Sequence, residues 1–360
     1  MASISSPAHD FGLANTIPEP RMLAIGIGGV GNDLLTNLMD NDSDGVYCVA
    51  TDTDRYHLQI ARAHSRFLIE SELSSESGTE GDVDAGRDAA LQASESLGRI
   101  FQGADVVFIL AGMGGGTGGG AAPIVSDLAR RSGSIVVGLV TMPSQFESDI
   151  FRTAIESIRR MLNSSDTLVL IDNHPSALSL TLPYGLSPNE QGQACCSLVS
   201  SITNALKDLS PLNRESAALR SLLRRGGLAK IRVGDSYSRW GTEEAILAVL
   251  RDSMPLGHLS DARGIFIDVV GDDGLSDAAI GLALDFLTPH IGTETELVCR
   301  RRVDEKMQGA TRVHLLATGV GFPYSWGGYR RIPIDLYDLE PESADDESVD
   351  LALDLQQLED

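Results

Sequence analysis

The sequence is poor in lysine, aromatic residues and cysteine. Only three of its 28 basic residues are lysines, aromatic residues make up 5% of the chain, and the four cysteines show no C-x-x-C spacing. That absence argues against a zinc site or a disulfide framework and fits a reducing compartment. No apolar run approaches the roughly 18 residues of a membrane-spanning helix, and no basic start precedes an apolar stretch as in a secretory signal. We therefore expect a cytoplasmic protein with no transmembrane segment and, since its histidines form no H-x-x-x-H pair, no metal site.

The charge balance is strongly acidic. Against the 28 basic residues stand 51 acidic ones, which gives a net charge of −23 over 360 residues. Such a chain repels phosphate backbones, so general nucleic-acid binding is not expected. Abundant aspartate, with arginine in place of lysine, is typical of proteins dissolved in molar salt, where a short Debye length screens self-repulsion. The composition favours a halophilic archaeon as the source over a merely acidic mesophile.

Short apolar runs alternate with helical patterns from residue 21 onward. In the first half, strands are expected at 22–27, 46–50, 105–111, 134–141 and 167–171, and helices at 32–39, 88–101, 121–131 and 148–162. This alternation predicts an α/β fold with a parallel sheet covered on both faces. A long helix is expected at 193–209, followed by a smaller α+β unit with strands at 226–233, 264–270, 296–302 and 311–318 and helices at 243–251 and 276–287.

Both ends of the chain differ from this pattern. Residues 1–20 are polar with scattered prolines and are expected to form a flexible arm. Residues 338–360 hold ten carboxylates and no basic residue, which predicts an acidic disordered tail from about residue 336. One short apolar pattern, Val349–Leu358, could dock in a groove of a partner protein.

Two glycine-rich turns carry the chemistry. The first, Gly26–Gly31, lies between a predicted strand and helix, where a phosphate can approach the backbone and the helix start supplies N–H donors. It also satisfies the dinucleotide fingerprint, with Asp52 at a suitable distance for a ribose hydroxyl, so an NAD enzyme and a turn that binds nothing remain alternatives.

The second turn is more informative, because seven of the nine positions 112–120, directly after a buried strand, are glycine. Consecutive glycines form a nest of N–H groups for anionic oxygens, and Thr117 offers a hydroxyl to a phosphate or its Mg²⁺. A linker explains the run poorly, since it lies between core elements. Two such turns on neighbouring strands predict a di- or triphosphate held between them.

The segment GGGTGGG at 114–120 resembles the GGGTGTG loop of the tubulin/FtsZ superfamily, with Gly119 where Ser, Ala or Thr is usual. Similar family segments follow in the same order over about residues 21–322: GIGGVGN (26–32), VATDTD (49–54), VGLVTMPSQFE (137–147), DTLVLIDN (166–173), ARGIFIDVVGDDGLS (262–276) and RVHLLATGVG (312–321). By these motifs the chain is identified as a divergent FtsZ-like member of that superfamily.

The resemblance implies a GTP-binding domain at 21–190, a central helix at 191–210 and, at 211–335, a domain that completes the GTPase site of the next subunit. It thus implies self-association, or association with other FtsZ-like subunits, in a cytoskeletal or cell-division role. Bound GTP or GDP, with Mg²⁺ as a possible companion, would be held by these residues: Gly28, Gly29, Gly31 and Asn32 at the diphosphate; Gly114, Gly115, Gly116, Thr117, Gly118 and Gly119 around the phosphates; Glu147 and Arg152 at the ribose or phosphate; and Asn173 near the sugar and base. Glu147 could instead be an exposed structural carboxylate, and Asn173 a strand-end cap.

The catalytic loop departs from the family pattern N-x-D-F-A-D. Here residues 213–218 read NRESAA, so Glu215 could replace the first aspartate, but Ala218 cannot act as an acid or base. Loss of a general base costs about 10²–10⁴-fold in rate. The sequence therefore predicts slow or absent hydrolysis and weak or no filament turnover. The alternative function is an active polymerising GTPase that uses Glu215. A third possibility is that Glu215 only caps the helix that follows it.

Two further segments depart from the family pattern, a loop and the start of the central helix. Residues 77–84 (SGTEGDVD) place carboxylates where the family wraps the γ-phosphate, which favours a diphosphate-bound state. The guanine-reading positions align with Gln191, Cys195 and Cys196, and cysteine cannot supply the paired acceptors that guanine requires. Guanine preference is thus implied by the resemblance alone, and the two cysteines are expected to be ordinary helix-face residues.

Overall fold

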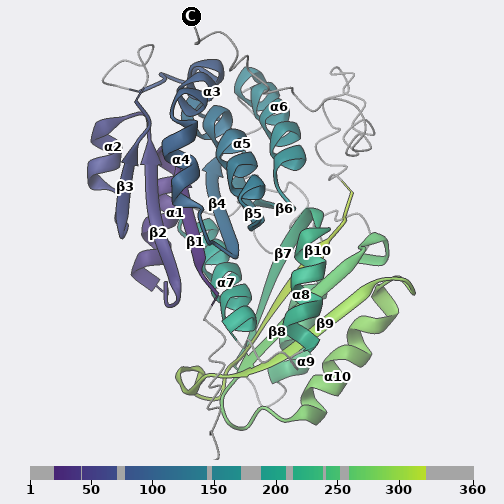
Figure 1. Cartoon of the computed structure of the whole chain (residues 1–360). Helices are drawn as coiled ribbons and strands as arrows, with labels where there is room; N and C mark the ends of the chain where they lie inside the picture. The colour runs from purple at the N-terminus through teal and green to yellow at the C-terminus, as the bar shows by residue number, and fades with distance from the viewer. Residues whose placement is uncertain are drawn as a thin grey trace, which may run out of the picture.

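The computed structural model describes residues 20–41, 43–70, 78–143, 148–171, 188–207, 214–237, 241–251 and 259–321. One ten-stranded sheet runs through the molecule in the order β3-β2-β1-β4-β5-β6-β7-β10-β8-β9 (Figure 1). Most of the predicted arm, the whole of the predicted tail, Glu147 and Asn173 lie outside the described residues.

The first six strands are all parallel to their neighbours. They are β1 (Met22–Ile27), β2 (Val46–Asp52), β3 (Ser65–Leu68), β4 (Val106–Gly112), β5 (Ile135–Thr141) and β6 (Thr167–Ile171). Strands β1, β4, β5 and β6 are buried at every position, because helices cover both faces of the sheet. The expected α/β fold is confirmed.

Two layers of helices enclose this part of the sheet. On one face pack α3 (Val83–Gln92), α4 (Ser94–Ile100), α5 (Gly116–Arg131) and α6 (Ser148–Ser164) (Figure 1). On the other face pack α1 (Gly28–Asn41), α7 (Pro188–Lys207) and α8 (Arg214–Arg224). The short helix α2 (Arg55–Ile60) follows β2, and Asp54 caps it by accepting from the N–H groups of Tyr56 and His57.

The second half continues the same sheet. Strand β7 (Gly227–Ser236) is parallel to β6 over three residue pairs and antiparallel to β10 (Thr311–Thr318). Next come β8 (Gly264–Gly271), antiparallel to β10, and β9 (Glu296–Val303), parallel to β8. The remaining elements are α9 (Gly241–Arg251), α10 (Asp277–Leu287) and the 3₁₀ turns η1 (Leu259–Asp261), η2 (Thr288–His290) and η3 (Glu305–Met307).

Several element boundaries differ from the sequence predictions. Helix α1 begins at Gly28 and α5 at Gly116, both inside the glycine turns rather than after them. The helix expected at 88–101 is two helices, α3 and α4, separated at Ala93, and α3 begins at Val83 because Asp82 caps its first turn. Strand β3 and helix α2 were not predicted. Among the described residues no helix is both long and apolar enough to cross a bilayer.

Candidate functional site

The two glycine turns meet where the strand order reverses. Strands β1 and β4 are neighbours, and their last residues pair as Ile27 with Ala111, so both turns leave the same edge of the sheet. The order β3-β2-β1-β4-β5-β6 switches direction between these two strands. Ligands of parallel sheets bind beyond the carboxyl ends of the strands at such a switch point.

The first turn touches the second through Gly28. This glycine has a φ of +71°, a backbone conformation that residues other than glycine rarely adopt. A Cβ at this position would lie 3.1 Å from the Gly118 nitrogen and 3.2 Å from the Thr117 Cβ. Gly31, one turn along α1, packs so closely on β4 that a Cβ would collide with the Leu110 carbonyl oxygen. Gly29 is half-buried, with only ordinary contact to His57.

The second glycine run has two parts with different surroundings. Gly114 is half-buried and Gly115 is exposed, and a Cβ at Gly115 would meet no atom within 4 Å. This open backbone, next to the positive-φ turn at Gly28, fits a bound phosphate. The glycines that follow are buried inside α5, and side chains there would collide with backbone or side-chain atoms of neighbouring segments: Gly116 with Asp82, Gly118 with Gly112, Gly119 with Ser157, and Gly120 with Val83. Their small size is therefore also required by helix packing.

Thr117 joins a cluster of threonine hydroxyls. Its side chain is 8% exposed, and its Oγ1 lies 2.7 Å from Thr53 Oγ1 and 3.3 Å from Thr79 Oγ1. The three residues come from the start of α5, the end of β2 and the turn before α3. Sequence reasoning singled out Thr117 alone, although Thr53 lies within the VATDTD segment. The cluster places three hydroxyl groups directly beside the start of α5.

Asn32 and Asp52 lie beneath the first turn, and each is only 2% exposed. Asn32 Nδ2 donates to the Thr51 carbonyl at 3.1 Å and to Asp52 Oδ2 at 3.3 Å, while Asp52 Oδ1 accepts from the Asp54 N–H at 3.2 Å. Burial raises the pKa of the Asp52 carboxyl. Both carboxylate oxygens are thus used inside the protein, an arrangement that does not favour the ribose-binding role of an NAD enzyme.

The remaining predicted residues are less closely associated with the turns. Arg152 is exposed on α6 and pairs with Asp149 at 3.3 Å. Cys195 and Cys196 are buried in α7, and burial raises the pKa of the Cys195 thiol well above its usual value. Both belong to the apolar core, in accord with the expectation of ordinary helix residues. Nothing is described of the Gln191 side chain.

Glu215 is exposed in the first turn of α8, and Ala218 packs half-buried on the apolar core. Burial, together with the charges of Glu215 and Asp268, raises the pKa of Cys299 in β9 to about 11. At the other end of α8, Arg224 donates to the Gly133 carbonyl at 3.2 Å, just before β5 begins. The carboxyl end of α8 therefore lies at the amino edge of the first half of the sheet, opposite the glycine turns.

The assembled site offers backbone N–H groups at the starts of α1 and α5, and the hydroxyls of Thr53, Thr79 and Thr117. Within the described residues no group of three or more His, Cys, Asp or Glu side chains is placed to hold a metal ion. This donor set suits anionic oxygens. Any divalent cation would need the phosphates of the ligand among its own ligands.

Comparison with known proteins gives consistent relatives. Residues 21–177 match the family model described as Tubulin/FtsZ family, GTPase domain. The chain is 32% identical over 318 residues to "Cell division protein FtsZ 2" of Methanocaldococcus jannaschii, covering 86% of this chain and 83% of the relative. It is 29% identical over 304 residues to "Cell division protein FtsZ 2" of Halobacterium salinarum, covering 84% and 77%.

Solved structures agree with the sequence relatives. An empty FtsZ dimer of M. jannaschii superposes with a TM-score of 0.75 at 27% identity, covering 84% of this chain and 89% of that one. A GTPγS-bound protofilament of CetZ2 from Haloferax volcanii gives a TM-score of 0.70 at 20% identity, over 88% of this chain and 98% of that one, a likeness of fold.

Proposed function

The chain belongs to the tubulin/FtsZ family, and from this premise we propose that it binds GTP or GDP between its two glycine turns and acts as an FtsZ-like cytoskeletal protein in cell division or cell shape. The observation that carries the proposal is the contact of Gly28 with Thr117 and Gly118 at the switch point of the sheet. The relatives are cell-division proteins, which supports the role.

In the proposed complex the open backbone at Gly115, its neighbour Gly114 and the first turn at Gly28 and Gly29 hold the phosphates. Helix dipoles from α1 and α5 favour the negative charge. Thr117 exchanges its bonds to the neighbouring threonines for one to a phosphate oxygen. Any Mg²⁺ binds through the phosphates. Glu147, Arg152 and Asn173 complete the ribose and base side as predicted.

We propose that hydrolysis is slow or absent in this chain. Glu215 lies at the start of α8, whose other end is at the edge of the sheet opposite the glycine turns, so in this proposal it serves the nucleotide of another subunit, and Ala218 offers it no second carboxylate. The second candidate is an active polymerising GTPase in which Glu215 takes a proton from the attacking water. The related FtsZ of M. jannaschii was solved as a dimer, which favours self-association in either case.

Nucleotide content tests the proposal. The full chain is purified in molar KCl, denatured, and the released nucleotide is identified by anion-exchange chromatography. We expect guanine nucleotide close to one per chain, with GTP retained if hydrolysis is slow. A protein that comes out empty and also fails to bind added GTP and GDP would contradict it.

Turnover distinguishes the two candidates. Under the first, wild type and Glu215→Ala release phosphate equally slowly; under the second, Glu215→Ala lowers turnover by about 10²-fold or more, and Glu215→Gln does the same because the amide cannot accept a proton. Asp261→Ala, an exposed carboxylate of η1, is the matched control. Phosphate release is measured in molar KCl with each variant's nucleotide affinity determined beside it.

A further inference from the structure

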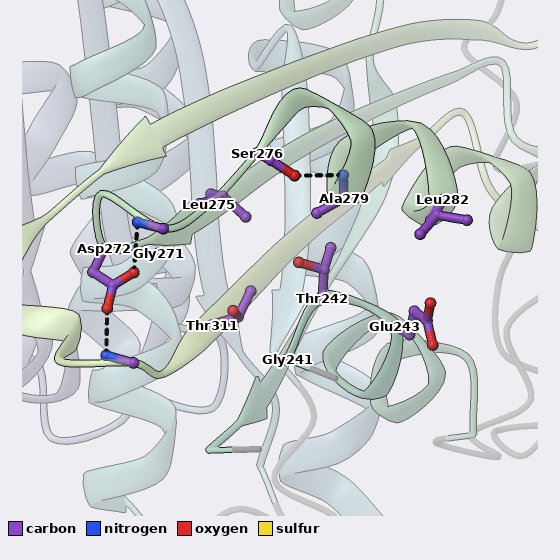
Figure 2. Close-up of a pocket in the computed structure, with 12 residues that line it drawn as sticks. Gly241, Thr242, Glu243, Gly271, Asp272, Leu275, Ser276, Ala279, Leu282 and Thr311 are labelled. Carbon is purple, nitrogen blue, oxygen red and sulfur yellow. Dashed lines mark hydrogen bonds between the residues drawn. The ribbon is translucent and has the colours of Figure 1, made fainter. Parts of the chain in front are cut away.

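A pocket lies in the second half of the molecule, apart from the two glycine turns. It has a volume of about 380 Å³ and is formed by the starts of α9 and α10, the end of β8 and the turn before β10 (Figure 2). This size lies within the range of small-molecule sites. None of its lining residues belongs to the glycine turns or the predicted nucleotide site.

Two helices begin at this pocket. Gly241 and Thr242 open α9, and Ser276 caps α10 by accepting from the Ala279 N–H at 3.2 Å. The first N–H groups of any helix have no partner within it, and the dipole makes that end positive. Four glycines of the wall, Gly241, Gly271, Gly274 and Gly309, supply no side chain to it, and the backbone of Gly274 and Gly309 is exposed. An anionic oxygen can therefore approach both helix starts.

Two threonines provide the independent observation. Thr242 is 7% exposed and Thr311 is 8% exposed, and both line the pocket. Neither hydroxyl makes a hydrogen bond with any part of the chain that the structure describes, and Figure 2 shows both side chains in the space between the turn before α10 and the start of α9. Each hydroxyl therefore faces the open space of the pocket rather than a partner in the described part of the protein. A ligand oxygen would satisfy both.

Acidic side chains limit the charge of the ligand. Asp272 Oδ1 accepts from the Gly274 N–H at 3.0 Å and its Oδ2 from the Gly309 N–H at 2.7 Å, which fixes the pocket wall (Figure 2). Glu243, half-buried in the first turn of α9, also lines the pocket. Two carboxylates repel a phosphate dianion but attract a cation. The opposite wall is apolar, formed by Leu275, Ala279 and Leu282.

We propose that this pocket binds a zwitterion of amino-acid size. The carboxylate accepts from Thr242, Thr311 and the helix N–H groups, the ammonium lies toward Glu243, and an apolar side chain packs on Leu275 and Leu282. The site is separate from the nucleotide site, so the two proposals stand or fall independently.

Binding of three related probes to the full chain tests this. L-leucine carries both charged groups, 4-methylpentanoate lacks the ammonium, and 3-methylbutylamine lacks the carboxylate. In titration calorimetry we expect saturable binding of leucine and at least about tenfold weaker binding of each analogue, the loss of about one charged hydrogen bond. If leucine does not saturate the protein at concentrations up to about 50 mM, its dissociation constant is too weak for a binding site and the proposal is overturned. Equal affinity for leucine and 4-methylpentanoate would overturn it as well.

Variants then locate the site. Thr242→Val and Thr311→Val should each weaken leucine binding about tenfold, and Glu243→Gln should weaken leucine but not 4-methylpentanoate. Thr153→Val, at a half-buried threonine of α6 that does not line this pocket, is the matched control. Thermal unfolding and circular dichroism confirm that each variant folds, and Thr242→Ser, which keeps the hydroxyl, should restore binding. Leucine binding unchanged in both valine variants would overturn the assignment.

Discussion

The hydroxyl of Thr117 is the side-chain group most closely joined to both glycine turns. It lies 2.7 Å from Thr53 Oγ1, and its Cβ is the neighbour that a side chain at Gly28 would meet at 3.2 Å. Any phosphate between the turns must therefore lie near it. The same residue also holds the end of β2 against α5, so its contributions to binding and to folding have to be separated experimentally.

Thr117→Val makes this separation. The valine keeps the shape but cannot donate to a phosphate oxygen, so we expect guanine-nucleotide affinity to fall about tenfold and the free energy of unfolding by about 1 kcal/mol. Thr117→Ser, which keeps the hydroxyl, should retain affinity. Titration with a fluorescent GTP analogue gives the affinity and chemical denaturation the stability. Wild-type affinity in Thr117→Val would remove the hydroxyl from the proposed site.

His314 is the residue that most directly couples stability to pH. It lies 3% exposed in β10, with Nδ1 3.8 Å from the Asp268 carboxylate. Burial lowers its pKa to about 4, although Asp268 and Asp235 act in the opposite direction, with Arg312 and Arg302 adding to the decrease. Asp268, itself fully buried, accepts from Ser201 of α7 at 2.6 Å and lies 3.5 Å from Arg302 Nε. Protonating His314 would place a further charge in this enclosed cluster.

The sign of the pH effect follows from linkage. The unfolded chain protonates His314 near pH 6.5 and the folded chain only near pH 4, so stability is fully present above pH 6.5 and falls as the pH decreases toward 4. Since one pKa unit corresponds to about 1.4 kcal/mol, this histidine alone accounts for a loss of about 3 kcal/mol over that interval. We expect His314→Gln to flatten the curve between these limits, and the exposed His290→Gln to leave it unchanged. Chemical denaturation at a series of pH values measures the free energy of unfolding of each variant. If that free energy depends on pH in the same way in both variants, the argument is contradicted.

Among the elements, α5 combines two roles in one glycine run. Its first turn lies at the proposed phosphate site, and its buried glycines let α3 and the turn before it approach closely, with a side chain at Gly120 colliding with the Val83 carbonyl. Glycine is a poor helix former, so the run is retained for close approach rather than for helix propensity. Gly115, outside the helix, faces open space instead.

Alanine at these two glycines separates packing from binding. Gly120→Ala should lower the free energy of unfolding by about 1–3 kcal/mol, as overpacking does. Gly115→Ala should change it by less than about 0.5 kcal/mol, because Gly115 has φ of −99°, which alanine adopts freely. If the backbone at Gly115 wraps a phosphate, Gly115→Ala instead lowers nucleotide affinity. Equal stability loss in both variants would contradict this division.

At the scale of the whole molecule, one sheet joins the two halves through the short β6–β7 pairing, and α7 packs across from the first half. The buried bond from Ser201 to Asp268 ties α7 to the second half. Over this frame the chain carries a net charge of −23. Self-repulsion on that scale opposes the compact state wherever salt does not screen it.

Salt should therefore stabilise the protein strongly. The Debye length falls from about 10 Å at 0.1 M to about 3 Å at 1 M, so most of the repulsion is screened in molar salt. We expect the unfolding temperature to rise by more than about 10 °C between these concentrations, which requires a gain of several kcal/mol, since 1 kcal/mol corresponds to about 2–4 °C in domains of about 150–250 residues and to less in a longer chain. Choline chloride at equal ionic strength shows whether screening alone suffices. An unfolding temperature independent of salt would contradict the proposed halophilic adaptation.

The sequence by itself determined the parallel α/β sheet and the position of the two glycine turns. Short continuous apolar runs that alternate with helical patterns indicate covered parallel strands, and glycines directly after such strands lie at the same edge of the sheet. Both signals are local, so they can be read without knowing which segments touch. The family resemblance rests on such local motifs too, and the relatives confirm it.

Only the tertiary structure decided which residues meet. The threonines at 53, 79 and 117 come from separate segments, the carboxylate of Asp52 turns inward to Asn32, and the glycines within α5 serve its packing against α3 as well as the turn. The pocket beside Thr242 and Thr311 joins residues up to 70 positions apart along the chain. These arrangements depend on long-range contacts, whose energies come from burial and close packing rather than from local sequence. No periodic pattern in the sequence therefore predicts them.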